Sequence, residues 1–229
     1  MLQNNKKGVY WIGTYMPISG LSINAYLIID DMPTLINAGA PITVDKLIKK
    51  LETIIEPKEL QYIVLNQADI SYAGGLKTLT TLAPQSRIVT SKYESYRLGL
   101  YELLIQPLII QDEDTLNIGN NTLYFYSAPF VGSPDAVYVY TDLDGILFSG
   151  EAFSTTVLGW ETVNAHDLTE LVEAYYDIYI GDSEIARNSI VRLKELDIRL
   201  IAPGHGPVLK NYVHKYIDAL GKGFAFTLE

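Results

Sequence analysis

The chain has 229 residues, a formal net charge of −10 and no cysteine. The lack of cysteine excludes disulfides, iron–sulfur clusters and thiolate zinc sites, and the acidic balance argues against a surface that follows nucleic-acid phosphates. No stretch reaches the ~20 apolar residues of a membrane-spanning helix, and the polar N-terminus lacks a signal-peptide core. We therefore expect one cytoplasmic domain, residues 1–229, that binds neither membrane nor nucleic acid.

The first half of the chain alternates strands with helices. Thr43 is expected to cap a helix whose apolar stripe runs from Leu47 to Ile55, and Pro57 is expected to end it. A second helix is predicted over 75–82, after the Gly74-Gly75 loop. Apolar, β-branched and aromatic runs predict the strands of this half at 9–13, 24–29, 34–37, 62–65 and 87–90.

The second half repeats the alternation. Asp142 to Gly145 predicts a hairpin turn, and Asp167 with Glu170 predicts a capping box for a helix. A further helix is expected to open at Ser183. Its inward residues are predicted to be Ala186, Ile190, Leu193 and Leu196, and those of the preceding helix Leu168, Leu171, Val172 and Tyr175. Strands are predicted at 123–127, 136–141, 145–148 and 199–202.

Strands followed by helices, twice over, predict an α/β fold of two mixed sheets packed face to face with helices outside, a four-layer αββα sandwich. Loops that leave strand ends tend to carry functional groups. The four such loops with suggestive chemistry are 67–72, 127–135, 149–153 and 204–206. If they converge, Asp69, Glu151 and His205 would meet, with Ser71, Tyr72 and Asp135 nearby.

The segment Leu65 to Gly75 has the strand–loop–helix setting in which two metal ions are often held. Such a site calls for a dense run of His, Asp and Glu. The segment contains one carboxylate, Asp69, and no imidazole. This depletion constrains the function more than any other feature of the sequence.

Landmarks along nearly the whole chain resemble the metallo-β-lactamase fold, in particular its flavodiiron branch and the related flavin-less oxygen-binding diiron proteins. Their order carries the resemblance, since each is weak alone. They are Val9-Tyr10-Trp11-Ile12-Gly13, Asn24-Ala25-Tyr26-Leu27-Ile28, Tyr62-Ile63-Val64-Leu65-Asn66, Asp114-Thr115-Leu116, Ala128-Pro129-Phe130, Leu147-Phe148-Ser149, Leu193-Lys194-Glu195-Leu196-Asp197 and Ala202-Pro203-Gly204-His205-Gly206-Pro207.

The resemblance implies where metal ligands would lie. The family places an H-x-E-x-D-H run after the position of Asn66, a further His after its Ala-Pro pair, a bridging Asp after its Phe-Ser pair, and a last His. In this chain those positions hold, in order, Gln67, Asp69, Ser71, Tyr72, Gly132, Glu151 and His205. The resemblance also implies a possible homodimer, and we expect no flavodoxin domain and no flavin.

Two divalent ions want eight or more ligand atoms, mostly from imidazole and carboxylate. The matching positions offer two carboxylates, Asp69 and Glu151, and one imidazole, His205. A complete diiron site is therefore not expected, and the main expectation is that no cofactor is bound. One iron, manganese or zinc ion is the alternative, held by these three residues as a facial triad, with Tyr72 as a weaker phenolate ligand.

Ordinary structural roles compete with these readings. Asp69 can cap the helix that follows it, Glu151 can form a salt bridge or contact backbone amides, and His205 can hold its Gly-Pro turn. Asp135 fits a turn residue. The remaining histidines, His166 and His214, have no motif partner and fit the surface.

The leading hypothesis is a degenerate diiron-type domain that is not catalytic and acts as a sensory, scaffolding or binding domain for an unknown protein partner or small ligand. The alternative is a metalloprotein that binds oxygen or performs redox chemistry through Asp69, Glu151 and His205, as an oxidoreductase of the diiron oxygen or nitric oxide reductase type. A metal-independent hydrolase has less support, because no Ser-His pair or G-x-S-x-G elbow is visible.

Overall fold

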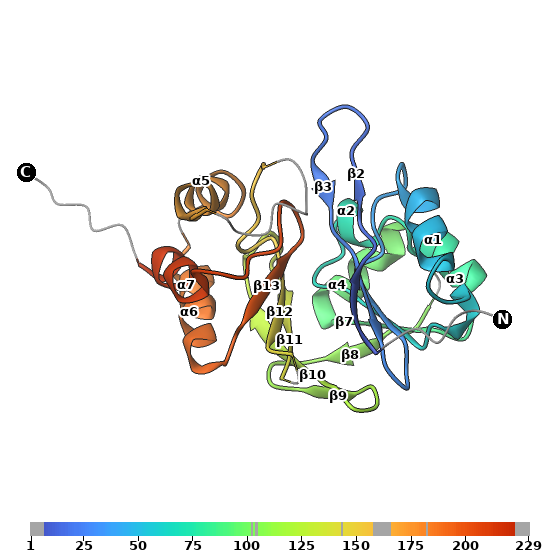
Figure 1. The fold of residues 1–229 in the computed structure, drawn as a ribbon. Coiled ribbons are helices and arrows are strands. Elements are labelled where there is room, and N and C mark those ends of the chain that lie inside the picture. The colour runs from blue at the N-terminus through green and yellow to red at the C-terminus, as the bar shows by residue number, and fades with distance from the viewer. Residues whose placement is uncertain are drawn as a thin grey trace, which may run out of the picture.

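The computed structural model describes residues 7–101, 103, 105–142, 144–157, 166–181 and 183–222. Two sheets lie face to face at the centre of the molecule, and helices cover the outer side of each (Figure 1). The predicted four-layer αββα sandwich is therefore confirmed. Among the described residues, no helix combines the length and hydropathy needed to cross a bilayer.

The first sheet has six strands in the order β1-β4-β5-β6-β7-β8. It is antiparallel from β1 to β5 and parallel from β5 onward. The strands are β1 Gly8–Trp11, β4 Tyr26–Ile29, β5 Thr34–Ile36, β6 Tyr62–Val64, β7 Arg87–Ser91 and β8 Leu108–Ile110. The helices of this half are α1 Val44–Glu52, α2 Ile70–Ala73, α3 Leu76–Leu82 and α4 Lys92–Leu98, with 3-10 turns at Pro57–Glu59 and Gly99–Tyr101.

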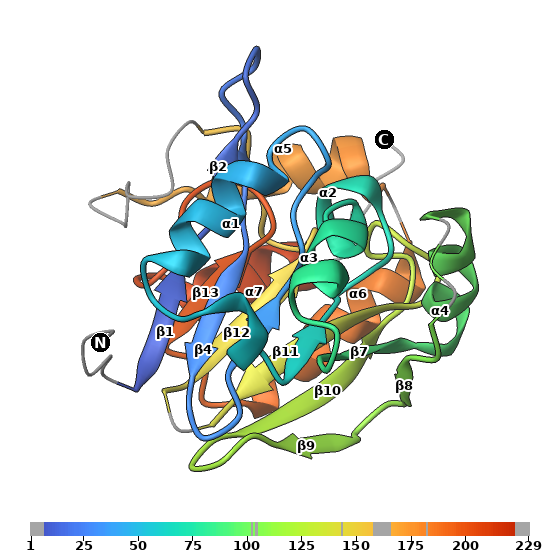
Figure 2. The same ribbon diagram turned by 90° about the vertical axis from the view of Figure 1, so that its right-hand side faces the viewer.

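The second sheet has five strands in the order β13-β12-β11-β10-β9, and a short hairpin stands apart from both sheets. The strands are β9 Thr115–Asn117, β10 Thr122–Ala128, β11 Ala136–Thr141, β12 Ile146–Gly150 and β13 Leu200–Pro203, and the hairpin is β2 Thr14–Tyr15 with β3 Ser22–Ile23. The helices are α5 Thr169–Tyr179, α6 Glu184–Arg192 and α7 Val213–Gly221, with a 3-10 turn at Leu193–Glu195. Figure 2 shows the hairpin and α5 at the same end of the molecule.

Three apolar cores separate the four layers. Strand β4 illustrates why, because successive side chains of a strand point to opposite faces. Leu27 joins the outer core under α1 and α3, whereas Tyr26 and Ile28 join the central core between the sheets. A third core packs α5, α6 and α7 on the second sheet.

Asn66, two residues after the end of β6, ties the two sheets together. Its side-chain amide donates to the backbone oxygens of Val137 in β11 (2.8 Å) and Phe148 in β12 (3.0 Å). Its oxygen accepts from Asn37 Nδ2 at 2.9 Å, and its backbone N–H donates to Asn37 Oδ1 at 3.1 Å. The residue is 1% exposed, so the ends of β5, β6, β11 and β12 are held in one buried polar cluster.

Several predicted helix details are wrong. The first helix ends at Glu52, before Pro57, because the chain tightens into a turn whose Ile54 and Ile55 N–H groups return to Leu51. Thr43 is the residue before this helix, but its hydroxyl bonds Ala40 O rather than the helix.

The predicted capping box at Asp167 is also shifted. Helix α5 begins at Thr169, and the Asp167 carboxylate accepts from Thr169 itself. Leu171 is 43% exposed, because the buried stripe of α5 runs through Val172, Tyr175 and Tyr176. The predicted cap at Ser183 is confirmed by its bond from Ala186 N.

The remaining differences are omissions and one turn. The sequence does not predict the β2–β3 hairpin, strands β8 and β9, or helices α2, α4 and α7. Of the predicted turn at 142–145, Leu143 lies outside the described residues, and the flanking strands β11 and β12 pair antiparallel as expected.

A buried carboxylate fastens the β9–β10 turn to the first sheet. Asp30 accepts from Asn121 N (2.8 Å), Asn121 Nδ2 (3.1 Å) and Asn120 Nδ2 (3.2 Å), and Lys7 Nζ lies 2.7 Å away. Burial alone would raise the pKa of this carboxyl, but Lys7 and the backbone amides outweigh it and hold the pKa of Asp30 below its ordinary value. The ionised form is therefore favoured by folding.

We predict that Asp30→Asn lowers the free energy of unfolding by about 1–3 kcal/mol at neutral pH, because buried donors lose their acceptor. A group whose pKa is depressed by folding stabilises above its unfolded pKa of ~3.9, and this contribution disappears as the pH falls below that value. Urea unfolding at neutral pH and near pH ~3 should therefore show the gap to wild type narrowing in acid.

Asp31→Asn is the matched control, because the Asp31 side chain is 64% exposed and shares the Lys7 contact. A loss of less than ~1 kcal/mol is expected there. Equal losses in the two variants would contradict the role given to Asp30.

Candidate functional site

A cavity of about 590 Å³ opens between the two halves of the sandwich, at the end where the predicted loops leave their strands. The hairpin, the loop before α1, and α5 supply its sides. Its walls comprise Met16, Leu21, Ile23, Ala40, Pro41, Ile42, Gln67, Asp69, Ile70, Ser71, Gly132, Glu151, Tyr175, Tyr179 and His205. The predicted convergence of the four loops is therefore observed, and Asp69, Glu151 and His205 all face this space.

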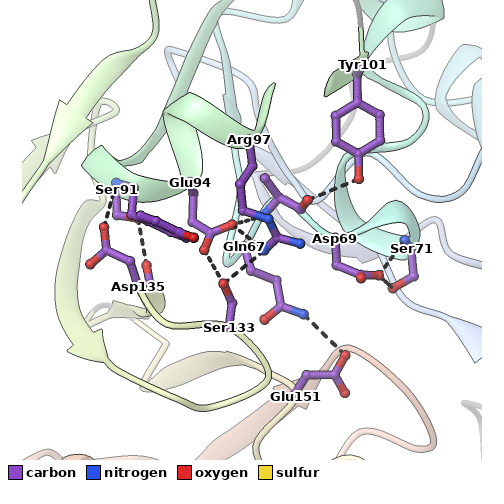
Figure 3. Close-up of polar contacts among 12 residues, drawn as sticks. Gln67, Asp69, Ser71, Ser91, Glu94, Arg97, Tyr101, Ser133, Asp135 and Glu151 are labelled. Atoms are coloured by element: carbon purple, nitrogen blue, oxygen red, sulfur yellow. Dashed lines mark hydrogen bonds and ion pairs between the residues drawn. The ribbon is translucent and has the colours of Figure 1, made fainter. Parts of the chain in front are cut away.

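Glu151, in the loop after β12, is the centre of the cavity floor. Its Oε1 accepts from Gln67 Nε2 at 3.3 Å, and its Oε2 accepts from the Tyr175 hydroxyl at 2.6 Å. Figure 3 shows the Gln67 amide pointing across the floor to Glu151. Burial and the Glu151 charge raise the pKa of Tyr175, so that phenol stays protonated and donates.

His205 is held in a defined orientation. Its Nδ1 lies 2.7 Å from the backbone oxygen of Ser22 in β3, and a carbonyl oxygen can only accept. Nδ1 therefore carries a proton, and Nε2 is an acceptor whenever the ring is neutral. That Nε2 lies 3.8 Å from Glu151 Oε1. The structural role proposed for His205 is also present, because its backbone N–H donates to Ser154 Oγ.

Asp69 faces the cavity but is engaged locally. Its Oδ1 accepts from Ser71 N at 3.0 Å and from Ser71 Oγ at 2.9 Å, which caps α2 (Figure 3). Asp69 therefore caps a helix as expected, but this helix is the short α2, which is not predicted from the sequence, and not the helix predicted over 75–82. Of the three predicted ligands, the fold brings Glu151 and His205 to each other and leaves Asp69 bonded to its own helix.

The side chains of Glu151 and Gln67 fill the space that a side chain at position 132 would occupy. A Cβ on Gly132 would lie 2.3 Å from Glu151 Cγ and 3.0 Å from Gln67 Oε1. The extra methylene of glutamate over aspartate thus occupies space that opens only because residue 132 is glycine. Gln67, Gly132 and Glu151 form one packed unit.

Tyr72 lies under the floor rather than in the wall. Its ring meets the edge of the His205 ring at a centroid distance of 5.9 Å, and it covers Gly204, where a Cβ would clash with the phenol. Burial, and then the negative charge of Glu151, raise the pKa of Tyr72 well above its ordinary value. This environment favours the protonated phenol over the phenolate predicted as a weaker metal ligand.

Residues 21–206 match the family described as ODP family beta lactamase. This chain belongs to that family.

The solved structures similar to this ODP-family chain are cores of larger proteins. The flavodiiron protein of Giardia intestinalis gives a TM-score of 0.84 at 24% identity, covering 93% of this chain and 56% of that one. The rubredoxin oxygen:oxidoreductase of Desulfovibrio gigas gives 0.83 at 19% identity, covering 93% and 59%. These likenesses establish the shared fold.

Curated relatives match nearly the whole chain. An uncharacterized protein of Methanocaldococcus jannaschii is 28% identical over 95% of this chain, and a nitric oxide reductase of Moorella thermoacetica is 24% identical over 94%. The ODP-family chain spans 59% of the length of each.

The donors of this ODP-family site do not add up to a diiron centre. Among the described residues, no group of three or more His, Cys, Asp and Glu side chains is placed to hold a metal ion. The family positions at 67, 72 and 132 carry a neutral amide, a buried phenol and no side chain. Two ions with four positive charges would meet far fewer than the eight ligand atoms they need.

A second polar network fixes the 67–69 loop from behind. Glu94 in α4 is fully buried and accepts from Ala68 N at 2.6 Å, from Arg97 Nη1 at 3.0 Å and from Ser133 Oγ (Figure 3). The hydroxyl of Tyr101 donates to Ala68 O at 3.0 Å. The loops carrying Gln67 and Gly132 are therefore held to the same helix.

Sequence reasoning missed some of these residues and misplaced another. Tyr175 has the spacing of an ordinary core residue, so nothing local reveals its bond to Glu151. Glu94 gives no local signal either, because its helix Lys92–Leu98 mixes charged, polar and aromatic residues. Asp135 is more than a turn residue, since its Oδ2 accepts from Tyr93 N at the start of α4 and it does not line the cavity. His166 and His214 are exposed, as predicted.

We predict that Gly132→Ala destabilises the protein by at least about 2 kcal/mol, because the new methyl group overpacks against Glu151 and the backbone there is left-handed (φ 77°). Gly181→Ala is the matched control, since Gly181 has φ 73° and open space around a built Cβ. Gly181→Ala should lower the free energy of unfolding by about 1 kcal/mol, which reflects backbone strain alone. Thermal unfolding measures both, and equal shifts would refute the packed unit.

Proposed function

We propose that this chain is a diiron-type domain that has given up metal-based oxygen chemistry and acts by binding, as a sensory or scaffolding module. Its occupant is a small ligand or a protein partner that uses the cavity. The proposal includes a cytoplasmic location, expected from the sequence, which has no apolar signal or membrane-spanning stretch, and a homodimer, implied by the family resemblance.

The observation that carries this proposal is the packed unit of Gln67, Gly132 and Glu151. The Glu151 carboxylate accepts hydrogen bonds from the Gln67 amide and the Tyr175 hydroxyl. The side chains themselves occupy the space beside position 132. Above this floor a cavity of about 590 Å³ is retained, within the ~300–1,000 Å³ of small-molecule sites.

A second candidate function is favoured by one contact. Glu151 Oε1 and His205 Nε2 face each other at 3.8 Å, and both can donate an electron pair to one iron, manganese or zinc ion. Asp69 would complete a facial triad only by leaving its bonds to Ser71. Such a metal would support oxygen binding or redox chemistry.

We predict that protein purified without chelators contains well under one iron, manganese or zinc ion per chain by elemental analysis. Reductant-driven consumption of dioxygen or nitric oxide should not exceed the protein-free rate. About one bound ion per chain, together with turnover, would overturn the proposal.

His205→Ala separates the two candidates. Under the binding proposal the variant and wild type carry the same trace of metal. Under the second candidate the wild type holds about one ion and the variant loses it. His214→Ala, which changes an exposed histidine, is the control for non-specific metal uptake.

A further inference from the structure

We propose that the cavity binds a small organic cation, in which an apolar or aromatic body carries a protonated nitrogen received by Gln67, Glu151 and His205. This inference rests on the proposed binding function and names the ligand class for the same site. The contacts on the floor, the charge of the walls and the character of the sides each support it.

Within the described part of the chain, the floor leaves one buried acceptor, the side-chain oxygen of Gln67, without a donor. Gln67 is 1% exposed, and its Nε2 faces the Glu151 carboxylate, which leaves Oε1 beside Gly132 with no hydrogen-bond partner among the described residues. Leaving a buried acceptor unsatisfied costs about 1–3 kcal/mol. With Nδ1 of His205 committed to Ser22, its Nε2 is a further acceptor next to Glu151 when the ring is neutral. A ligand head rich in N–H groups satisfies this arrangement.

The negative charge of the cavity walls favours a positively charged ligand. The described lining residues include two carboxylates, Asp69 and Glu151, and neither lysine nor arginine. The chain as a whole carries −10. A carboxylate or phosphate ligand would meet repulsion throughout the cavity, whereas an ammonium or amidinium group is attracted to it.

The apolar sides of the cavity favour a ligand with an organic body over a bare metal ion. They are largely aliphatic, from Leu21 and Ile23 of the hairpin to Ile42 and Ile70 at the mouth. Tyr175 and Tyr179 stack at a centroid distance of 4.2 Å and add aromatic faces next to the Glu151 carboxylate. Aromatic faces attract organic cations by about 0.5–2 kcal/mol. A hydrated metal ion would leave these apolar sides unfilled.

The test uses three probes with the same ring and different heads: phenethylamine, phenethyl alcohol and hydrocinnamate. Isothermal titration calorimetry of the full chain should show binding of the amine, at least about tenfold weaker binding of the alcohol, a difference of ~1.4 kcal/mol, and no binding of the anion. Equal affinities for amine and alcohol, or no binding of any probe, would overturn the inference.

Glu151→Gln keeps the shape of the side chain and removes its charge. It should weaken amine binding at least about tenfold and leave alcohol binding within about twofold. Glu52→Gln, at an exposed carboxylate of α1, should change neither. Unchanged amine binding in Glu151→Gln would refute the assignment.

Tyr179→Ala provides a second test in case Glu151→Gln does not fold. Tyr179 is 54% exposed, so its removal is expected to leave the fold intact. It should weaken amine binding several-fold more than alcohol binding, and an equal effect on both would count against an organic cation.

Zinc chloride, titrated in parallel, separates this inference from the proposed function. Zinc binding that displaces phenethylamine and disappears in His205→Ala would overturn both. If phenethylamine does not bind and the protein is also free of metal and inactive toward dioxygen and nitric oxide, only the assignment of an organic cation is overturned, and the proposed binding function stands.

Discussion

The buried amide of Asn66 is the contact on which the rest of the molecule depends. Two stacked sheets share only side-chain packing unless a polar group crosses between them, and a buried amide crosses only if its donors and acceptor are satisfied. Asn66 meets that condition by reaching Val137, Phe148 and Asn37. The next residue, Gln67, starts the cavity floor, so the cross-sheet bond also sets where the floor begins.

The floor illustrates how one residue makes room for another. A glutamate is longer than an aspartate by one methylene, and Gly132 leaves the space for it. The carboxylate then needs donors, and Gln67 and Tyr175 provide them. The result is a carboxylate stabilised by neutral hydrogen bonds inside a fold whose resemblance implies metal ions at that position. Since a partly satisfied polar network is less stable than a complete one, the unpartnered oxygen of Gln67 marks where a ligand would act.

Much of the architecture followed from local pattern. The apolar runs at 62–65 and 136–141 predicted strands β6 and β11, and Ser183 predicted the cap of α6, because these depend on residues near each other in the chain. Helix ends were less predictable. The apolar stripe continues past Glu52 while the backbone already turns, and periodicity does not distinguish the two.

The cavity likewise has features that the sequence predicts and features that depend on tertiary packing. Residue types and their order were enough to identify the fold, the four loops and the shortage of imidazole at the family's ligand positions, because each is carried by short stretches of chain. Which groups touch was a matter of packing between distant segments. Tyr175 meets Glu151 across 24 residues, and His205 is oriented by Ser22 across 183. Such pairings arise only when both sheets and α5 are in place, since no local spacing encodes the distance between them.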